Sequence, residues 1–394
     1  MRFTPQSELE QRCQRLQNEM RKAGIEASLI IQNADLFYLT GSIQPGYLFV
    51  PAEGQPLFLV RKNLERAKEE SALEKVIAIK SPKEITKLVA ECGFPPPKTL
   101  ALELDVLPAS QYLRLQEVFK PAEIKDISPL LRQVRAFKSP YEIEILRDAA
   151  RLSDLIIATA RANLQEGITE IELAARIEAA ARAAGHQGFV RMRAFNQESY
   201  WGHLISGPDA ALPSFVDSPT GGKGLTPAFS QGASRRRIQR QEPVVVDMCG
   251  AVDGYVVDQT RILSLGPLPE PLLHAYNTSL IIQKELETMI RPGIKCQELY
   301  YQALQIAKEA GLEEHFMGWG ANRAAFCGHG AGIELDELPV IAPFSAMELA
   351  PGMVFAVEPK FTFPGLGVVG VEDTFAVTEN GNEKLTSSPY EYEV

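Results

Sequence analysis

The feature that most constrains the fold is a stretch of sequence that occurs twice, 126 residues apart. Residues 164–185 read LQEGITEIELAARIEAAARAAG, and residues 290–311 read IRPGIKCQELYYQALQIAKEAG. Each copy has a Gly-Ile turn, a helix start and a glycine where the helix should stop, at Gly185 and Gly311. Chance similarity between two alanine-rich helices is the alternative explanation. If the repeat is a duplication, it predicts two related α/β halves that face each other across a cleft.

The length and composition indicate a two-domain globular protein with no nucleic-acid partner. A chain of 394 residues is too long for one ordinary core. A net charge of −10 argues against binding phosphate backbones. The chain has neither an apolar run of about 18 residues nor a signal-peptide core at its N-terminus, so we expect no membrane partner. Five widely spaced cysteines without a CxxC pair are typical of reduced thiols, which predicts a cytoplasmic protein.

The first third of the chain alternates helical and strand patterns. Residues 7–24 form an amphipathic helical pattern that ends at Gly24. Short apolar runs then follow, at residues 27–31, 46–50, 56–60, 75–79 and 99–104. Helical stretches separate most of these runs, and this alternation predicts an α/β layer domain.

A domain boundary is predicted near residue 138. Ser139, Pro140 and Glu142 form a capping box with proline at the first helical position. The helix that they open carries its apolar residues on one face. We therefore expect one domain over residues 1–137 and a second over residues 138–394.

Two predicted hairpins in the second domain each carry a pair of acidic residues. Asp247 and Asp258 lie in β-branched runs around an Asp-Gly turn signal, symmetric about residue 252.5. We therefore expect them to face each other across the ladder, close enough to share a metal ion. Glu358 and Glu372 are symmetric about Gly365 in the second hairpin, so the same geometry is expected there.

A histidine between the hairpins completes a candidate metal centre. His329 lies between two glycines, which let backbone and ligand approach closely. Four carboxylates inside apolar strands must be paired or bind cations if they are buried, because burying an unpaired charge is costly. The alternative is that they face solvent on alternating strands. Oxygen-rich ligation with one imidazole suits two divalent ions, with manganese first and cobalt, zinc or iron as alternatives.

These motifs resemble those of the pita-bread metallopeptidases, in their creatinase, prolidase and aminopeptidase P branch. The segment DMCGAVDGYVVDQTR matches the family's two aspartates, GHGAG its histidine motif, and VEP and VED its two glutamates. The resemblance implies an α/β creatinase-like N-terminal domain and an α+β pita-bread domain with an internal pseudo-twofold repeat. It also implies a homodimer with two metal ions that hydrolyses Xaa-Pro peptides, with Glu358 as the residue that carries a proton.

The residues expected to contact substrate depart from the family pattern. Ser214 stands where these peptidases usually have a histidine after Ala-Leu-Pro, Asp336 where they have a second histidine, and Val340 where prolidases often have an arginine. Loss of the arginine argues against recognition of a free substrate carboxylate. Asp336, protonated or facing a cationic substrate group, and His203, on the strand that leads to Ser214, are the remaining catalytic candidates. A structural role is the alternative for both.

Two further features complete the expected site. Arg261 follows the second aspartate as part of a Thr-Arg pair and is expected to orient the ligands rather than to catalyse. The glycine-rich stretch at residues 217–227 is expected to be a mobile loop over the cleft.

The altered substrate residues leave the reaction open. The leading hypothesis is a dinuclear Xaa-Pro dipeptidase or aminopeptidase with an altered pocket. A hydrolase of a non-peptide C–N bond in a small metabolite is the alternative. A non-catalytic binding relative is the third hypothesis, and the complete set of five ligands argues against it.

Overall fold

The computed structural model describes residues 2–196 and 200–394, which divide into two units. The first unit comprises Met1–Arg135 and Arg193–Gln197, and the second comprises Ala136–Met192 and Glu198–Val394. The boundary predicted between residues 137 and 138 stays a prediction. No helix within the described ranges is long and apolar enough to span a bilayer.

The first unit is an α/β layer built around one six-stranded sheet. Its strand order is β4-β3-β2-β1-β5-β6, with β2 antiparallel to β1 and β3 and the other pairs parallel. The strands are β1 (Ala27–Ile30), β2 (Gly46–Pro51), β3 (Leu57–Val60), β4 (Val76–Ala78), β5 (Thr99–Leu102) and β6 (Glu123–Asp126). The helices are α1 (Gln6–Lys22), α2 (Asn33–Thr40), α3 (Leu64–Glu70), η1 (Pro82–Glu84), α4 (Ile85–Glu91), α5 (Ala109–Val118) and α6 (Ser128–Ala136), whose last residue begins the second unit.

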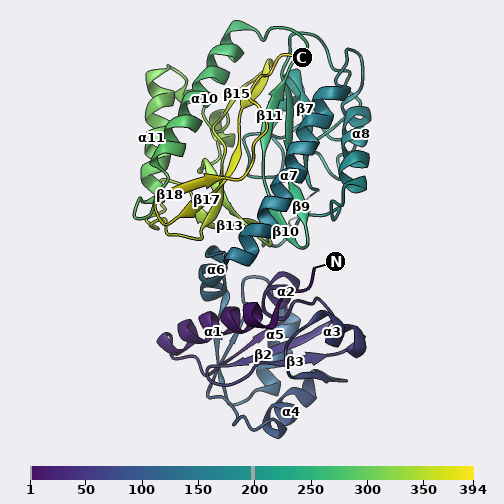
Figure 1. The fold of residues 1–394 in the computed structure, drawn as a ribbon, viewed down its shortest axis with the longest axis vertical. Coiled ribbons are helices and arrows are strands. Elements are labelled where there is room, and N and C mark those ends of the chain that lie inside the picture. The colour runs from purple at the N-terminus through teal and green to yellow at the C-terminus, as the bar shows by residue number, and fades with distance from the viewer. Residues whose placement is uncertain (1, 197–199) are drawn as a thin grey trace. The chain divides into compact units, whose positions relative to one another are not determined.

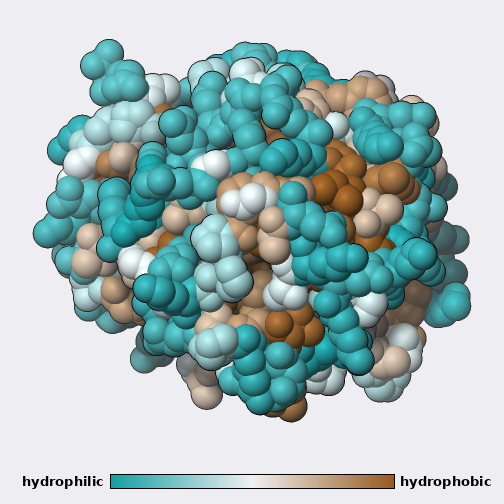
Figure 2. Space-filling model, turned by 90° about the horizontal axis from the view of Figure 1, so that it is seen from below, coloured by the Kyte–Doolittle hydropathy of each residue, from teal (hydrophilic) through white to brown (hydrophobic). Residues whose placement is uncertain are grey.

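Each apolar run of the first third becomes a strand; β1, β2, β3 and β5 are largely buried in the sheet, while β4 is a partly exposed edge strand. Leu29, Leu48 and Leu59 are fully buried in adjacent strands. Helix α1 ends two residues before Gly24, which has a positive φ of 65° and so allows the chain to leave the helix. The face of the molecule in Figure 2 is mostly hydrophilic, with apolar residues in separate areas between hydrophilic ones.

The second unit places strands between two pairs of helices. In Figure 1, α7 (Pro140–Asn163) and α8 (Glu170–Ala183) lie on one side of these strands, and α10 (Glu270–Met289) and α11 (Cys296–Glu309) lie on the other. Its shorter helices are α9 (Gly207–Ala210), η2 (Glu313–His315) and η3 (Gly320–Asn322). The capping box predicted for α7 is present, since Ser139 accepts from the Glu142 backbone and Glu142 accepts from the Ser139 backbone.

The repeat in the sequence corresponds to equivalent helices. Helix α11 begins and ends 126 residues after α8, the same spacing as in the repeated sequence. The glycines before the two helices, Gly167 and Gly293, have φ of 81° and 87°, and the glycines after them, Gly185 and Gly311, have positive φ as well. The two halves therefore use the same turn and helix, as the duplication predicts.

Two sheets and two hairpins form the strand layer of the second unit. The three-stranded sheet has the order β11-β8-β7 and the five-stranded sheet the order β13-β12-β14-β17-β18, while β9 pairs with β10 and β15 with β16. The strands of the first half are β7 (Gly202–Ser206), β8 (Val244–Met248), β9 (Gly250–Val252), β10 (Tyr255–Val257) and β11 (Thr260–Leu263). Those of the second half are β12 (Gly328–Ala331), β13 (Leu335–Val340), β14 (Val354–Val357), β15 (Lys360–Phe363), β16 (Gly367–Gly370), β17 (Asp373–Thr378) and β18 (Gly381–Lys384).

Candidate metal centre

The first predicted hairpin forms, but its register differs by one residue from the expectation. Asp253 and Gly254 have φ of 48° and 89° and make the two central residues of the turn. The ladder is therefore centred on 253.5 rather than 252.5, and Asp247 in β8 lies opposite Thr260 in β11. The prediction that Asp247 and Asp258 face each other directly is wrong. Asp258 lies instead between β10 and β11, after Val257.

The second hairpin has the predicted register. Lys360 at the start of β15 pairs with Gly370 at the end of β16, so the ladder is symmetric about Gly365. Glu358 immediately follows β14 and Glu372 immediately precedes β17, one on each side of this hairpin. The hairpin therefore presents two carboxylates at its open end.

Asp258, His329 and Glu372 converge on one point that suits a metal ion. Each offers a ligand atom within 4.8 Å of the others. His329 Nε2 lies 4.0 Å from Asp258 Oδ2, 3.5 Å from Glu372 Oε1 and 3.8 Å from Glu358 Oε1. Among the described residues, Glu372 Oε1 is a buried oxygen without a hydrogen-bond partner. A buried oxygen of this kind needs a cation or a donor, so these residues fit a divalent metal.

A lysine that the sequence analysis missed occupies the other side of the centre. Lys360 Nζ donates to Asp247 Oδ2 at 3.0 Å, to Glu358 Oε2 at 2.9 Å and to Glu372 Oε2 at 2.8 Å. The signal was its place two residues after Glu358, because side chains at i and i+2 of an extended segment point to the same face. On this side the donor set does not fit a second metal while Lys360 is in place, since a divalent cation there would need the carboxylate oxygens that the ammonium already occupies and would be repelled by its positive charge.

The crowding of carboxylates perturbs their ionisation. Burial, followed by the charges of Glu372 and Asp247, raises the pKa of Asp258 well above its usual value. Burial raises the pKa of Glu358 to about 7, although Lys360 opposes this. Burial disfavours the Glu372 carboxylate too, but Lys360 and His329 outweigh it and hold the Glu372 pKa far below its usual range. Cation binding to this cluster would relieve the repulsion.

A cavity of about 630 Å³ opens onto these residues within the second unit. All five predicted ligands and Lys360 line it, as do His203 and Asp336. Residues 217, 218, 225 and 226 of the predicted loop also line it, which puts part of that loop at the cavity. The apolar part of its lining includes Ile171, Met192, Leu204, Leu225, Phe229, Phe326 and Leu335. A volume of this size accommodates a short peptide or another small molecule.

The two predicted substrate residues approach the centre from different strands. His203 in β7 lies opposite Asp247 in the ladder, and Gln231 Nε2 lies 2.9 Å from His203 Nε2. Burial lowers the pKa of His203, so its neutral form is favoured. Asp336 in β13 has a positive φ of 64°, and its Oδ1 lies 3.5 Å from His329 Nδ1.

The other departures from the family pattern lie beside the cavity rather than in its lining. Ser214 is half-buried, and its Oγ accepts a hydrogen bond from the Val216 backbone at 3.4 Å. Val340 pairs with His329 across the β12–β13 ladder. Neither residue is among those that line the cavity in the described ranges.

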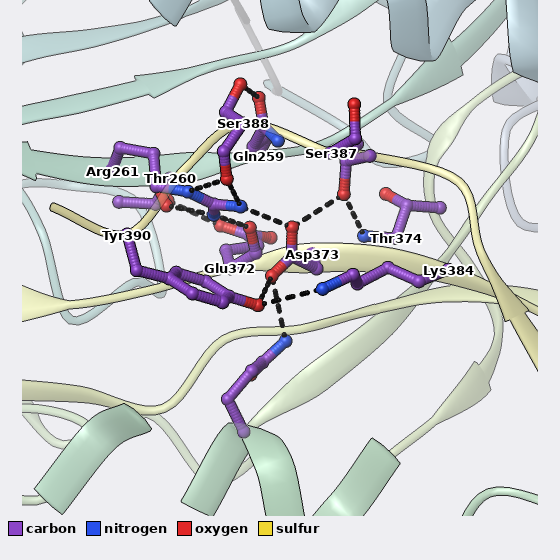
Figure 3. A network of polar contacts seen from close by, with 12 residues as sticks. Gln259, Thr260, Arg261, Glu372, Asp373, Thr374, Lys384, Ser387, Ser388 and Tyr390 are labelled. Atoms are coloured by element: carbon purple, nitrogen blue, oxygen red, sulfur yellow. Dashed lines mark hydrogen bonds and ion pairs between the residues drawn. The ribbon is translucent and has the colours of Figure 1, made fainter. Parts of the chain in front are cut away.

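Arg261 holds the backbone behind the ligands, as Figure 3 shows. Its Nη1 donates to the carbonyl oxygens of Thr260 at 2.9 Å and of Glu372 at 2.8 Å. Its Nη2 donates to Asp373 Oδ1 at 2.7 Å. Thr260 Oγ1 in turn donates to Glu372 Oε2 at 2.7 Å. The pair Thr260-Arg261 thus fixes the position of Glu372 without facing substrate, in agreement with the expected orienting role.

Comparison with known proteins places these residues in a family. The model of metallopeptidase family M24 matches residues 144–379, and the creatinase/prolidase N-terminal domain model matches residues 12–137. The Xaa-Pro dipeptidase of Pyrococcus horikoshii is 30% identical over 377 residues, covering 94% of this chain and 95% of that protein. The crystal structure of the prolidase from the same organism aligns with a TM-score of 0.81 at 28% identity, covering 97% and 99% of the two chains. The structure of an Xaa-Pro dipeptidase from Bacillus anthracis has a TM-score of 0.83 at 26% identity, covering 98% and 99%.

Proposed function

Because the chain belongs to metallopeptidase family M24, with a creatinase/prolidase N-terminal domain, we propose that it hydrolyses the amide bond before proline in short Xaa-Pro peptides. The observation that carries the proposal is the convergence of four buried carboxylates and His329 on one cavity. Relatives named Xaa-Pro dipeptidases match over nearly their whole length, which supports the same substrate class.

Family membership implies a dinuclear metal site, and part of that site fits the residues present. Asp258, His329 and Glu372 would hold a divalent metal, for which we propose manganese because the ligands are mostly hard oxygens with one imidazole. When bound, the metal supplies Lewis-acid polarisation of the scissile carbonyl.

The chain's own residues would position the substrate and move protons. Glu358 lines the cavity with its Oε1 3.8 Å from His329 Nε2, and we propose that it takes up and delivers a proton there. His203 would donate a hydrogen bond to the scissile carbonyl, with Gln231 holding its ring. Asp336, 44% exposed, would attract the cationic end of the substrate.

The charge of the cavity favours recognition of an amino group over recognition of a carboxylate. The described lining residues include no arginine, and their one lysine, Lys360, is bound to three carboxylates. Glu178, Asp217 and Asp336 add negative charge. We therefore propose an aminopeptidase-like preference for longer Xaa-Pro peptides. The same acidic lining motivates the second candidate, hydrolysis of a C–N bond in a small cationic metabolite.

The test is a comparison of substrates with the manganese-loaded full-length protein. Xaa-Pro dipeptides and Xaa-Pro-Xaa tripeptides should be cleaved, tripeptides faster, while Xaa-Ala controls should not. Glu358→Gln should remove the activity without preventing folding. If no Xaa-Pro peptide is cleaved but a cationic non-peptide amide is, the second candidate replaces the first.

The assembly and compartment are proposals of the same kind. We propose a homodimer, from the family resemblance, and a cytoplasmic location, since the five cysteines are free thiols and four of them are buried. Light scattering on the purified protein tests the first, since a monomeric mass would contradict it. Fractionation of the source cells tests the second.

A further inference from the structure

The ammonium of Lys360 lies at the centre of the carboxylate cluster. Its side chain is 2% exposed, and those of its three partners, Asp247, Glu358 and Glu372, are at most 9% exposed. An ammonium has three N–H donors, and each has one carboxylate oxygen within 3.0 Å. All three N–H donors of Lys360 are therefore used by carboxylates of the cluster.

The carboxylate oxygens of the cluster form two halves, one around Lys360 and one beside His329, and Glu358 and Glu372 contribute one oxygen to each half. Glu358 and Glu372 each direct Oε2 to Lys360 and Oε1 toward His329. Asp247 belongs to the half that holds Lys360, and Asp258 belongs to the half that faces His329. Each half thus has its own set of oxygens.

A glycine lies opposite Lys360 in the β15–β16 hairpin and allows the two strands to approach closely. Lys360 pairs with Gly370, where a Cβ would lie 2.5 Å from the Pro359 carbonyl oxygen, 2.7 Å from Lys360 Cα and 2.8 Å from Lys360 Cγ. Because real Cβ contacts are essentially never so short, a larger residue at position 370 would force the backbone at Pro359 and Lys360 to shift, and the lysine side chain with it. Gly370 therefore permits the close approach of the two strands at Lys360, and the three carboxylates hold Nζ.

We propose that the Lys360 ammonium takes the place of one of the two metal ions that the family implies. A metal held by Asp247, Glu358 and Glu372 would use the same oxygens that the ammonium occupies, and it would meet a fixed positive charge there. Lys360 excludes a metal from this half. The half formed by Asp258, His329 and Glu372 remains open, so this centre holds at most one divalent ion. This inference concerns metal stoichiometry and does not depend on the proposed peptide substrate.

The test is the number of manganese ions bound per chain. Full-length protein is stripped with a chelator and dialysed against Mn²⁺, and bound metal is counted by elemental analysis, with electron paramagnetic resonance to detect coupling between paired ions. We expect at most one Mn²⁺ and an uncoupled spectrum in the wild type. Lys360→Ala should bind one more Mn²⁺ than the wild type and should show a coupled pair.

Lys138→Ala is the matched control, because Lys138 is also buried and paired with a carboxylate, Glu337 Oε2 at 2.9 Å, outside the cavity lining. It should leave the manganese count unchanged. Two Mn²⁺ per chain in the wild type, or equal counts in the wild type and Lys360→Ala, would overturn the inference. If neither Lys360→Ala nor Lys360→Gly folds, the wild-type count and spectrum decide by themselves.

Discussion

Arg261 and Asp373 form a buried ion pair, 2.7 Å from Nη2 to Oδ1, with side chains 1% and 0% exposed. The same guanidinium holds the carbonyl oxygen of Glu372, and its carbon lies 4.5 Å from the centre of the Tyr390 ring. Ser388 contributes a carbonyl oxygen 2.7 Å from Nη2. This network joins β11, the start of β17 and the C-terminal segment (Figure 3), so the backbone of Glu372 cannot move independently of it.

We predict that Arg261→Met destabilises the protein and weakens metal binding. It leaves the Asp373 carboxylate buried without its cation, which typically costs about 3–5 kcal/mol of unfolding free energy. Loss of a residue that orients a ligand typically lowers metal affinity about 10–100-fold. Urea unfolding and Mn²⁺ titration measure the two effects. The control is Arg147→Met, whose partner Glu383 is half-exposed and which should cost about 1 kcal/mol or less. Equal effects of the two variants would contradict this account.

His203→Ala tests the proposed contact with substrate. Because a positioned imidazole contributes about 10²-fold or more to such reactions, kcat/KM for Xaa-Pro peptides should fall on the order of 100-fold. The manganese count should not change, since His203 is not among the ligands. His274→Ala is the control, because His274 is exposed on α10 and bonds to the Ala310 carbonyl. Unchanged kcat/KM in His203→Ala would show that this histidine has a structural role.

Bound metal should stabilise the folded chain. A ligand that binds the folded state alone raises the unfolding free energy by about 2.7 kcal/mol at 100 times its dissociation constant. We expect Mn²⁺ to produce a rise of this size in the wild type and none in Asp258→Ala, which removes one of the three converging ligands. Thermal unfolding with and without Mn²⁺ provides the measurement. The same rise in both proteins would place the metal elsewhere.

The elements that the sequence predicted are those that carry an apolar run or a helix-capping motif. The apolar runs became β1 to β5, and the capping box at Ser139 marked the start of α7. Strand β6, which reads EIKD, was missed because it is a partly exposed edge strand without an apolar run. Its pairing with β5 comes from the sheet and not from its own composition.

The sequence predicted which acidic residues and which histidine gather at the metal centre, but not how the strands that carry them pair. The first hairpin was placed one residue out of register, because its turn is centred between Asp253 and Gly254. Lys360 was missed although it lies two residues after Glu358, because its contacts with Asp247, 113 residues away, and with Glu372 depend on how both hairpins pair. Contacts between distant strands decide such positions, and they become visible only when both registers are known.

Asp154 should make part of the stability depend on pH. Its carboxylate accepts hydrogen bonds from Ser387 N at 2.9 Å, Ser387 Oγ at 2.6 Å and Ser388 Oγ at 2.7 Å, which tie the C-terminal segment to α7. Burial raises its pKa, but these hydrogen bonds outweigh burial and hold the pKa below its usual range. A carboxyl group whose pKa is lower in the folded state stabilises that state above its unfolded pKa of about 3.9. This contribution is lost as the pH falls through the folded pKa.

We therefore predict that Asp154→Asn lowers the unfolding free energy at pH 7 by about 1–2 kcal/mol, because hydrogen bonds to a charged acceptor are lost. Urea unfolding of both proteins at pH 7, 5, 4 and 3 should show a constant difference down to about pH 5 and a smaller one below pH 4. Glu144→Gln, on the exposed side of the same helix, should change stability by no more than about 0.5 kcal/mol. A difference between wild type and Asp154→Asn that persists unchanged at pH 3 would mean that the Asp154 charge does not hold the C-terminal segment.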